Sequence, residues 1–310
     1  MNPKITIGPN LFHWPADKKR DFYFRIADEA PVDTVYIGEV VCSKRAPFFE
    51  KHYPEVADRL QKGGKSVVFS SLAEIMIKRE RNMTEGLCAL EDFPVEANDS
   101  AALYHLRGKP HHIGPFLNVY NEDTLTHLTL NGATHVTLPP ELPASAIAVL
   151  GRKANVLDVT LEVQVYGRLP LAISARCYHA RAHGRVKDNC QFVCEEDPDG
   201  MVLKTLADKP FLAVNGIQTL SYTCLNLMQE LHDMKEMGIS AFRLSPHNHD
   251  MVETAKLFRA VLDEALSAEE ATAKLKKSGM DVPFANGFYH GAEGYKWVDM
   301  TGEAAENTGT

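Results

Sequence analysis

The sequence has no long apolar run. Nowhere in its 310 residues does an apolar stretch approach the ~20 residues that span a bilayer. Its first ten residues, MNPKITIGPN, also lack the basic segment, apolar stretch and small-residue cleavage site of a secretory signal. We therefore expect a cytoplasmic protein without a transmembrane segment. Structural disulfides are uncommon in the cytosol, so the six cysteines indicate metal binding or catalysis before disulfide pairing.

Positive charge is also in deficit. The chain has 33 Lys and Arg residues against 41 Asp and Glu residues, which gives a formal net charge of −8. Proteins that follow a phosphate backbone usually present a basic surface. We therefore expect no nucleic-acid partner.

Familiar catalytic motifs are missing. Residues 63–66, Gly-Gly-Lys-Ser, resemble a phosphate-binding loop, but Arg59 stands where that motif requires glycine. Neither a G-x-S-x-G elbow nor an H-E-x-x-H metalloprotease helix occurs. Cys190 and Cys194 are spaced like the start of a radical-SAM motif, but Asp197 occupies the position of its third cysteine. The sequence therefore assigns no catalytic residue.

Short apolar runs alternate with longer amphipathic stretches along most of the chain. Such alternation predicts a parallel sheet covered by helices. Eight strand candidates fit an α/β fold of the (β/α)₈ TIM-barrel type, and a doubly wound open sheet is the alternative. The expected strands are Ile5–Ile7, Thr34–Ile37, Ser66–Ser70, Phe93–Glu96, Ile113–Asn118, His135–Leu138, Val159–Val165 and Ile239–Leu244. The expected helices are Lys18–Ala27, Phe48–Leu60, Leu72–Arg81, Glu122–Leu130, Leu225–Met237 and Met251–Leu266.

One connection interrupts this rhythm. After the seventh strand, residues 177–218 are unusually polar, and a long loop in a compact domain usually has a function. Phe211–Asn215 and Thr219–Tyr222 are expected to form a hairpin across Gly216. We therefore predict a single domain over residues 1–285 with an inserted cysteine-bearing loop, and a weakly ordered tail over residues 286–310.

Four of the cysteines form a candidate metal site. Cys177, Cys190 and Cys194 lie in the inserted loop with the spacing C-x₁₂-C-x₃-C, and Cys42 follows the second strand. In a parallel barrel all loops that follow strands emerge on one face, so the fold can bring Cys42 to the other three. Structural zinc sites usually combine two closely spaced pairs, whereas only one such pair occurs here. The spacing favours an iron–sulfur cluster and leaves zinc open.

The surroundings of the cysteines separate ligands from core residues. Cys88 and Cys224 stand among apolar residues and are expected in the core. Cys190 and Cys194 stand among charged residues, where an exposed free thiol pair would be a liability. Near Cys177, His179 and His183 are candidate donors to cluster sulfurs, or one could replace a cysteine ligand, and exposed loop histidines are the simpler expectation.

Several segments resemble the collagenase-like peptidase family. The signature-like run is Glu162-Val163-Gln164-Val165-Tyr166-Gly167, followed by Ala175-Arg176-Cys177, and further similar segments are residues 4–9, 35–43, 212–216 and 219–221. The resemblance implies a [4Fe–4S] cluster on Cys42, Cys177, Cys190 and Cys194. It also implies a heterodimer with a paralogue, a lipid-carrier-like accessory protein and a ubiquinone precursor as substrate. The activity implied is oxygen-independent hydroxylation in ubiquinone biosynthesis, with prephenate as the proposed oxygen source.

A cluster capped by four cysteines has no open iron for a substrate, so electron transfer is the expected chemistry. The alternatives are an RNA-hydroxylating enzyme of the same family, a non-catalytic iron–sulfur scaffold and, last, a peptidase. Five residues at expected strand ends are candidates for a substrate pocket, although capping or barrel packing is the simpler role of each: Glu39, Asn98, Asn118, Glu141 and Arg243.

Overall fold

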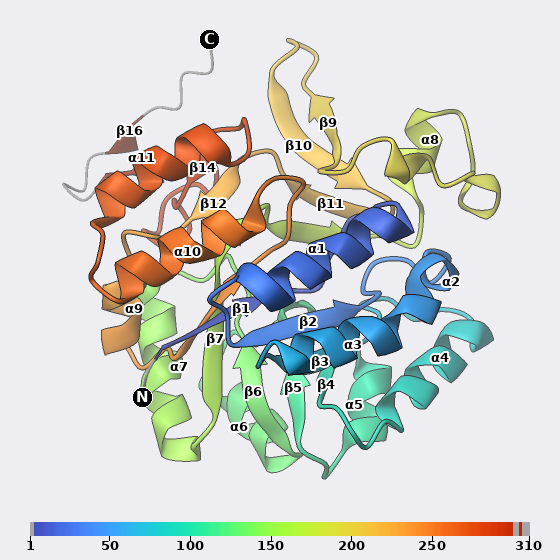
Figure 1. Ribbon diagram of the computed structural model, residues 1–310, viewed down its shortest axis with the longest axis horizontal. Helices are drawn as coiled ribbons and strands as arrows, with labels where there is room; N and C mark the ends of the chain where they lie inside the picture. Colours follow the sequence, from blue (N-terminus) through green and yellow to red (C-terminus); the bar gives the residue numbers. More distant parts are fainter. Residues whose placement is uncertain (1–2, 300–303, 306–310) are drawn as a thin grey trace.

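A closed barrel of parallel strands forms the body of the protein. The computed structural model describes residues 3–299 and 304–305. Each strand of the barrel pairs with its neighbours in parallel, and the last strand pairs with both the seventh and the first. The eight strands are β1 (Lys4–Ile7), β2 (Thr34–Gly38), β3 (Ser66–Ser70), β4 (Val95–Ala97), β5 (His111–Ile113), β6 (Ala133–Thr137), β7 (Thr160–Gly167) and β13 (Ala241–Leu244). The predicted TIM-barrel-like fold is confirmed (Figure 1), and the open sheet is wrong.

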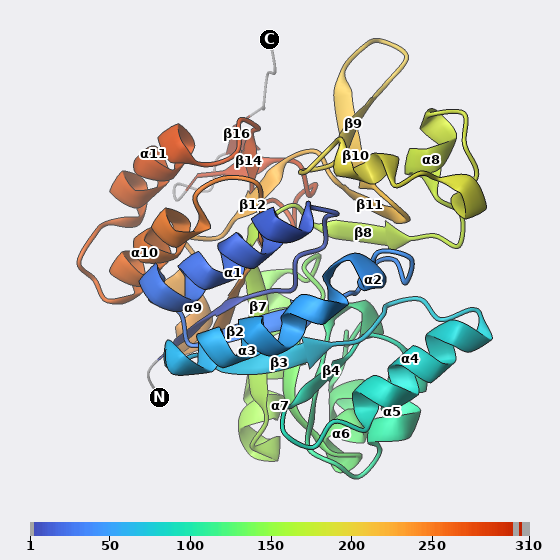
Figure 2. The same ribbon diagram turned by 45° about the vertical axis from the view of Figure 1, so that its right-hand side comes forward.

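Helices cover the outside of the barrel (Figures 1 and 2). Their apolar residues pack against the outward side chains of the strands in one large core. Side-chain caps fix the start of several helices: Asp99 accepts from the Ala101 N–H at 2.7 Å, and Asn121 accepts from the Thr124 N–H at 2.8 Å. The helices around the barrel are α1 (Ala16–Glu29), α2 (Ala46–Phe49), α3 (Tyr53–Lys62), α4 (Lys78–Cys88), α5 (Ser100–Leu106), α6 (Glu122–Leu130), α7 (Ala144–Leu157), α9 (Leu231–Glu236), α10 (Met251–Leu262) and α11 (Ala268–Ser278).

An inserted lobe separates β7 from β13. It contains an antiparallel sheet of four strands in the order β8-β11-β10-β9, formed by β8 (Pro170–Ile173), β9 (Met201–Lys204), β10 (Pro210–Asn215) and β11 (Gln218–Ser221). The lobe also carries the short helix α8 (Tyr178–Ala182) and the 3₁₀ turns η3 (Lys187–Asn189) and η4 (Val193–Glu195). In both views this lobe lies at the end of the molecule opposite the N-terminus (Figures 1 and 2). The hairpin predicted across Gly216 is confirmed, because Asn215 pairs with Gln218 in antiparallel register.

Three predicted elements are placed differently. The fifth strand ends at Ile113, because Pro115 has no backbone N–H for the sheet and begins the 3₁₀ turn η2 (Pro115–Leu117). The helix predicted from Leu72 begins only at Lys78. The helix predicted from Leu225 is preceded by β12 (Cys224–Asn226), which pairs with the end of β7.

The C-terminal segment after residue 285 is described in part. Asn286 is fully buried, and its side-chain amide donates to Glu230 Oε1 at 2.8 Å and to the Val298 carbonyl at 2.9 Å. Residues 300–303 and 306–310 of the predicted tail lie outside the described residues. Within the described part of the chain, no helix has the length and apolar character needed to cross a bilayer.

Candidate metal centre

The loop after β2 positions Cys42. β2 ends at Gly38, which has a φ of +135° and lies so close to β3 that a Cβ would approach the Ser70 carbonyl oxygen to 2.5 Å. Glycine is therefore required where the chain leaves the barrel. The Glu39 carboxylate then accepts hydrogen bonds from the Val41 and Cys42 N–H groups, each at 3.0 Å. This cap holds the backbone of Cys42 in a fixed turn.

The inserted lobe positions the other three cysteines. Cys177 caps α8, accepting from the Ala180 N–H at 3.4 Å, and its own thiol donates to the Gly216 carbonyl at 3.2 Å. Cys190 follows η3 and Cys194 lies in η4. Between them, Gln191 and Phe192 have positive φ values of 50° and 55°. Two consecutive non-glycine residues in the left-handed region cost free energy, and such strain often marks a functional turn.

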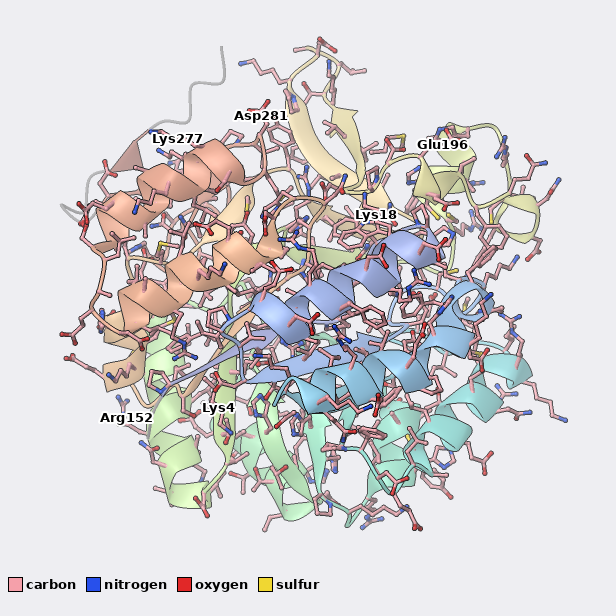
Figure 3. The ribbon with its side chains drawn as sticks, viewed as in Figure 1. Lys4, Lys18, Arg152, Glu196, Lys277 and Asp281 are labelled. Atoms are coloured by element: carbon pink, nitrogen blue, oxygen red, sulfur yellow. The ribbon has the colours of Figure 1, made fainter. Side chains whose placement is uncertain are left out.

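All four cysteines line one small pocket. Its walls are formed by Cys42, Lys44, Arg45, Cys177, Lys187, Cys190, Phe192, Val193, Cys194 and Gly216. Figure 3 shows sulfur atoms beside the segment of the lobe that carries the labelled Glu196. The expectation that the barrel topology brings Cys42 to the loop cysteines agrees with this arrangement. Cys88 and Cys224 are 2% and 0% exposed and lie in the core, as predicted.

A buried cation adjoins the pocket. Arg45 is 3% exposed and donates to the Leu11 carbonyl at 3.1 Å and to Asn215 Oδ1 at 2.6 Å. It also lies near the thiol of Cys194, whose pKa its positive charge lowers. Among the described residues, no carboxylate forms an ion pair with Arg45. Buried charges are normally paired, so this guanidinium calls for an anion in the pocket.

The thiols themselves respond to two opposing influences. Burial raises the pKa of Cys42, Cys177 and Cys194 above the ordinary value for a thiol. The Arg45 guanidinium acts in the opposite direction on each pKa, without overcoming the effect of burial. A bound metal would favour the thiolates much further, because coordination deprotonates a thiol.

The spacing of the sulfurs bears on the kind of metal. Among the described residues, the only group of three or more His, Cys, Asp or Glu ligands with all ligand atoms within 4.8 Å of one another is His179, His183 and Asp197. No three of the cysteine sulfurs are therefore that close together. A zinc ion with Zn–S bonds of about 2.3 Å would hold its sulfurs about 3.8 Å apart. The cysteines are thus spread more widely than a single-ion site requires.

The five strand-end candidates have different surroundings, and only Asn98 and Arg243 are linked, through their shared partner Glu96. Glu39 caps the Cys42 turn, Asn98 binds Ser71 and Glu96, and Asn118 ends η2 in a left-handed conformation. Glu141 accepts a hydrogen bond from Tyr120 on the surface. Arg243 points into the barrel interior, where it is 4% exposed.

Around Arg243 lies a polar cluster that the sequence did not reveal. Its guanidinium contacts Glu96 Oε1 at 2.6 Å and Glu162 Oε2 at 2.5 Å, and it stacks 4.1 Å from the centre of the Tyr36 ring. Burial would raise the pKa of Glu162, but Arg243 holds this pKa well below its usual range. The sequence contains one signal for this cluster: Glu96 and Glu162 lie within strands, between apolar residues that are buried.

Two stacked histidines complete this cluster. The rings of His112 and His135 lie 4.5 Å apart and nearly parallel. Burial lowers the pKa of His112 to about 3, and its Nδ1 lies 3.1 Å from the Tyr36 hydroxyl. His112 is therefore neutral at physiological pH.

Fold and site together define a (β/α)₈-barrel protein with an inserted lobe that gathers four cysteines on the face where strands end. The chain belongs to peptidase family U32, whose family model matches residues 23–299. This is the collagenase-like family that the signature-like run around Glu162 indicated.

Solved structures with a similar course of the chain are distant in sequence. N-acetylneuraminate lyase from Fusobacterium nucleatum is 12% identical, with 89% of this chain and 82% of that chain covered and a TM-score of 0.45. The tryptophan synthase complex from Pyrococcus furiosus is 12% identical, with 90% of this chain and 97% of that chain covered and a TM-score of 0.42. The spore cortex-lytic enzyme SleL from Bacillus cereus is 10% identical, with 86% of this chain and 76% of that chain covered and a TM-score of 0.39.

Proposed function

We propose that Cys42, Cys177, Cys190 and Cys194 bind a [4Fe–4S] cluster and that the chain is the redox subunit of an oxygen-independent hydroxylase in ubiquinone biosynthesis. The observation that carries the proposal is the shared pocket of these four cysteines, drawn from the loop after β2 and from three parts of the inserted lobe. Four thiols are the usual ligand set of such a cluster.

The chemistry of the pocket fits an anionic group of this size. In this structure, no three of the sulfurs lie within 4.8 Å of one another, which is wider than a single zinc ion requires and closer to what a four-iron cube requires. Arg45 is buried without a carboxylate partner, and thiolates carrying a metal cluster would provide its counter-charge. Lys44 and Lys187 also line the pocket, and each already has a carboxylate partner, Asp188 and Glu74 respectively. When bound, a cluster of this type supplies one-electron transfer.

The residues of the chain have separate tasks in this proposal. The Glu39 carboxylate holds the backbone of Cys42 in place. The Asn215 side chain holds the backbone of Cys194, because it donates to the Cys194 carbonyl at 2.9 Å and to the Asp197 carbonyl at 2.8 Å. Burial of Cys177 and Cys194 limits the access of water to these two thiols, and Arg45 would offset the negative charge of the thiolates. None of these residues is assigned to binding the substrate.

The pathway and partners rest on the resemblance within the family. The chain length and cysteine placement resemble UbiV, a ubiquinone-biosynthesis protein that acts as a heterodimer with its paralogue UbiU. A UbiU-like partner, a UbiT-like lipid-carrier accessory protein and a ubiquinone precursor are therefore part of the proposal. The excess of acidic residues speaks against the alternative, an RNA-hydroxylating enzyme, and salt-dependent RNA binding would favour it again.

A deletion strain tests the pathway. Without this chain, cells should lose ubiquinone during anaerobic growth and keep it during aerobic growth. Wild-type protein and a Cys224→Ala variant should restore anaerobic ubiquinone, whereas Cys190→Ala should not, because Cys224 lies in the core and Cys190 lines the pocket. Normal ubiquinone in the anaerobic deletion strain would refute the pathway. Gross unfolding of Cys190→Ala would favour the scaffold alternative.

A further inference from the structure

A second group of possible metal ligands lies beside the cysteine pocket. His179 and His183 are four residues apart at α8, and their rings are 5.3 Å apart with an angle of 8° between the planes. Asp197 lies just after η4, and its Oδ2 is 3.0 Å from His179 Nε2. One ligand atom from each of the three residues lies within 4.8 Å of the other two. This spacing suits a single ion.

Hydrogen bonds to backbone carbonyls orient both rings. His179 Nδ1 lies 3.2 Å from the Val214 carbonyl oxygen, and His183 Nδ1 lies 3.0 Å from the His179 carbonyl oxygen. A carbonyl can only accept, so Nδ1 carries the proton in both rings. In a neutral ring the lone pair is then on Nε2. Histidines that bind metals are usually oriented in this way by a second hydrogen bond.

The other nitrogen of the buried ring faces a carboxylate without a well-aligned hydrogen bond. His179 is 0% exposed, and its Nε2 makes no hydrogen bond of acceptable geometry. The same Nε2 lies 3.0 Å from Asp197 Oδ2. A nitrogen lone pair and a carboxylate oxygen at this distance repel each other unless a proton or a cation lies between them.

We propose that His179, His183 and Asp197 bind a divalent transition-metal ion of the zinc type. Two imidazoles and one carboxylate are a ligand set found in zinc and non-haem iron sites. Three protein ligands would leave a coordination position for water, and the exposed His183 side chain places one ligand at the surface. The site shares no ligand with the cysteine pocket.

The position of the site indicates its effect on the chain. The ion would tie α8, which begins after Cys177, to the segment that follows Cys194. It would therefore fix the relative positions of two cysteines of the pocket. The Asn215 amide also holds this segment, because it donates to the Asp197 carbonyl at 2.8 Å.

Zinc titration of the full-length protein, purified without oxygen, tests the proposal. The first equivalent of Zn²⁺ should bind with nitrogen and oxygen ligands only, at about 2.0–2.1 Å in zinc X-ray absorption spectra. His183→Ala and Asp197→Asn should each weaken zinc binding at least about tenfold. The matched control is His127→Ala, an exposed histidine on α6, and it should bind zinc like the wild type.

Three results would overturn the proposal. They are the absence of zinc uptake, a sulfur shell at about 2.3 Å for the first equivalent, and unchanged zinc affinity in both variants. Absence of uptake would mean that a proton, and not a metal, lies between His179 and Asp197. Iron and sulfide measured on the same samples report on the cysteine pocket, so failure of one site can be told from failure of the other.

Discussion

Replacing Arg243 should cost the protein a large part of its stability at neutral pH. Its guanidinium is the cation between two fully buried carboxylates, Glu96 and Glu162, at 2.6 and 2.5 Å. Removing one partner of a buried ion pair leaves an uncompensated charge and costs about 3–5 kcal/mol. The stacking on Tyr36 adds up to about 2 kcal/mol. We expect Arg243→Leu to lower the free energy of unfolding by about 4 kcal/mol at pH 7.

The pH dependence of this loss identifies its cause. In the wild type, Arg243 depresses the pKa of Glu162, so the stability from this carboxylate is present above the unfolded pKa of about 4.3 and is constant from pH 7 to pH 5. Without Arg243, burial should raise the pKa of the Glu162 carboxylate above the unfolded value. A carboxylate with a raised pKa stabilises the fold when it is protonated, and its contribution to the free energy of unfolding is lost as pH rises. The variant should therefore regain at least about 1 kcal/mol between pH 7 and pH 5.

Urea denaturation followed by far-UV circular dichroism at both pH values measures these changes. Arg152→Leu is the matched control, because Arg152 is exposed on α7, at the end of the molecule away from the inserted lobe (Figure 3). It should change stability by less than about 0.5 kcal/mol. Arg243→Lys keeps the charge and should lose less than Arg243→Leu. A loss for Arg243→Leu no larger than the control, or one independent of pH, would refute the reasoning.

Three further predictions concern the cysteine pocket. Arg45→Met removes the buried cation, so the purified protein should retain less iron and sulfide than the wild type, and equal retention would contradict its proposed role. Gly216→Val should lower the unfolding free energy by about 1–3 kcal/mol in urea denaturation, because Gly216 has a φ of +69° and a Cβ there would lie 2.3 Å from Arg45 Nη2. Cys224→Ala should leave the iron content unchanged, since Cys224 is buried in the core; loss of iron would place this thiol at the metal.

Local patterns in the sequence were enough to predict the barrel. Runs rich in Val, Ile and Thr mark strands because β-branched residues favour extended backbone, and β2 and β3 were located nearly to the residue. The topology of a parallel barrel then explains how Cys42 can lie near Cys177, although the two are 135 positions apart in the sequence. The short strand β5 was misplaced because Pro115 turns the chain immediately after it.

Contacts across the barrel could not be predicted in the same way. Arg243 and Glu96 are 147 residues apart, and nothing in either segment identifies the other as its partner. Arg45 reads as an ordinary charged loop residue, yet its guanidinium is buried beside the thiols. The burial of His179 also went unrecognised, because polar neighbours in the sequence made a solvent-exposed loop the simpler expectation. These features depend on packing between distant segments.

Analysis of iron, acid-labile sulfide and zinc in the anaerobically purified protein tests the central claim most directly. The account predicts about four iron and four sulfide per chain, with the absorption spectrum of a [4Fe–4S] cluster. Both should be lost in Cys190→Ala and kept in Cys224→Ala. Zinc in stoichiometric amount without iron or sulfide, or iron retained by Cys190→Ala at the wild-type level, would contradict the assignment of the four cysteines.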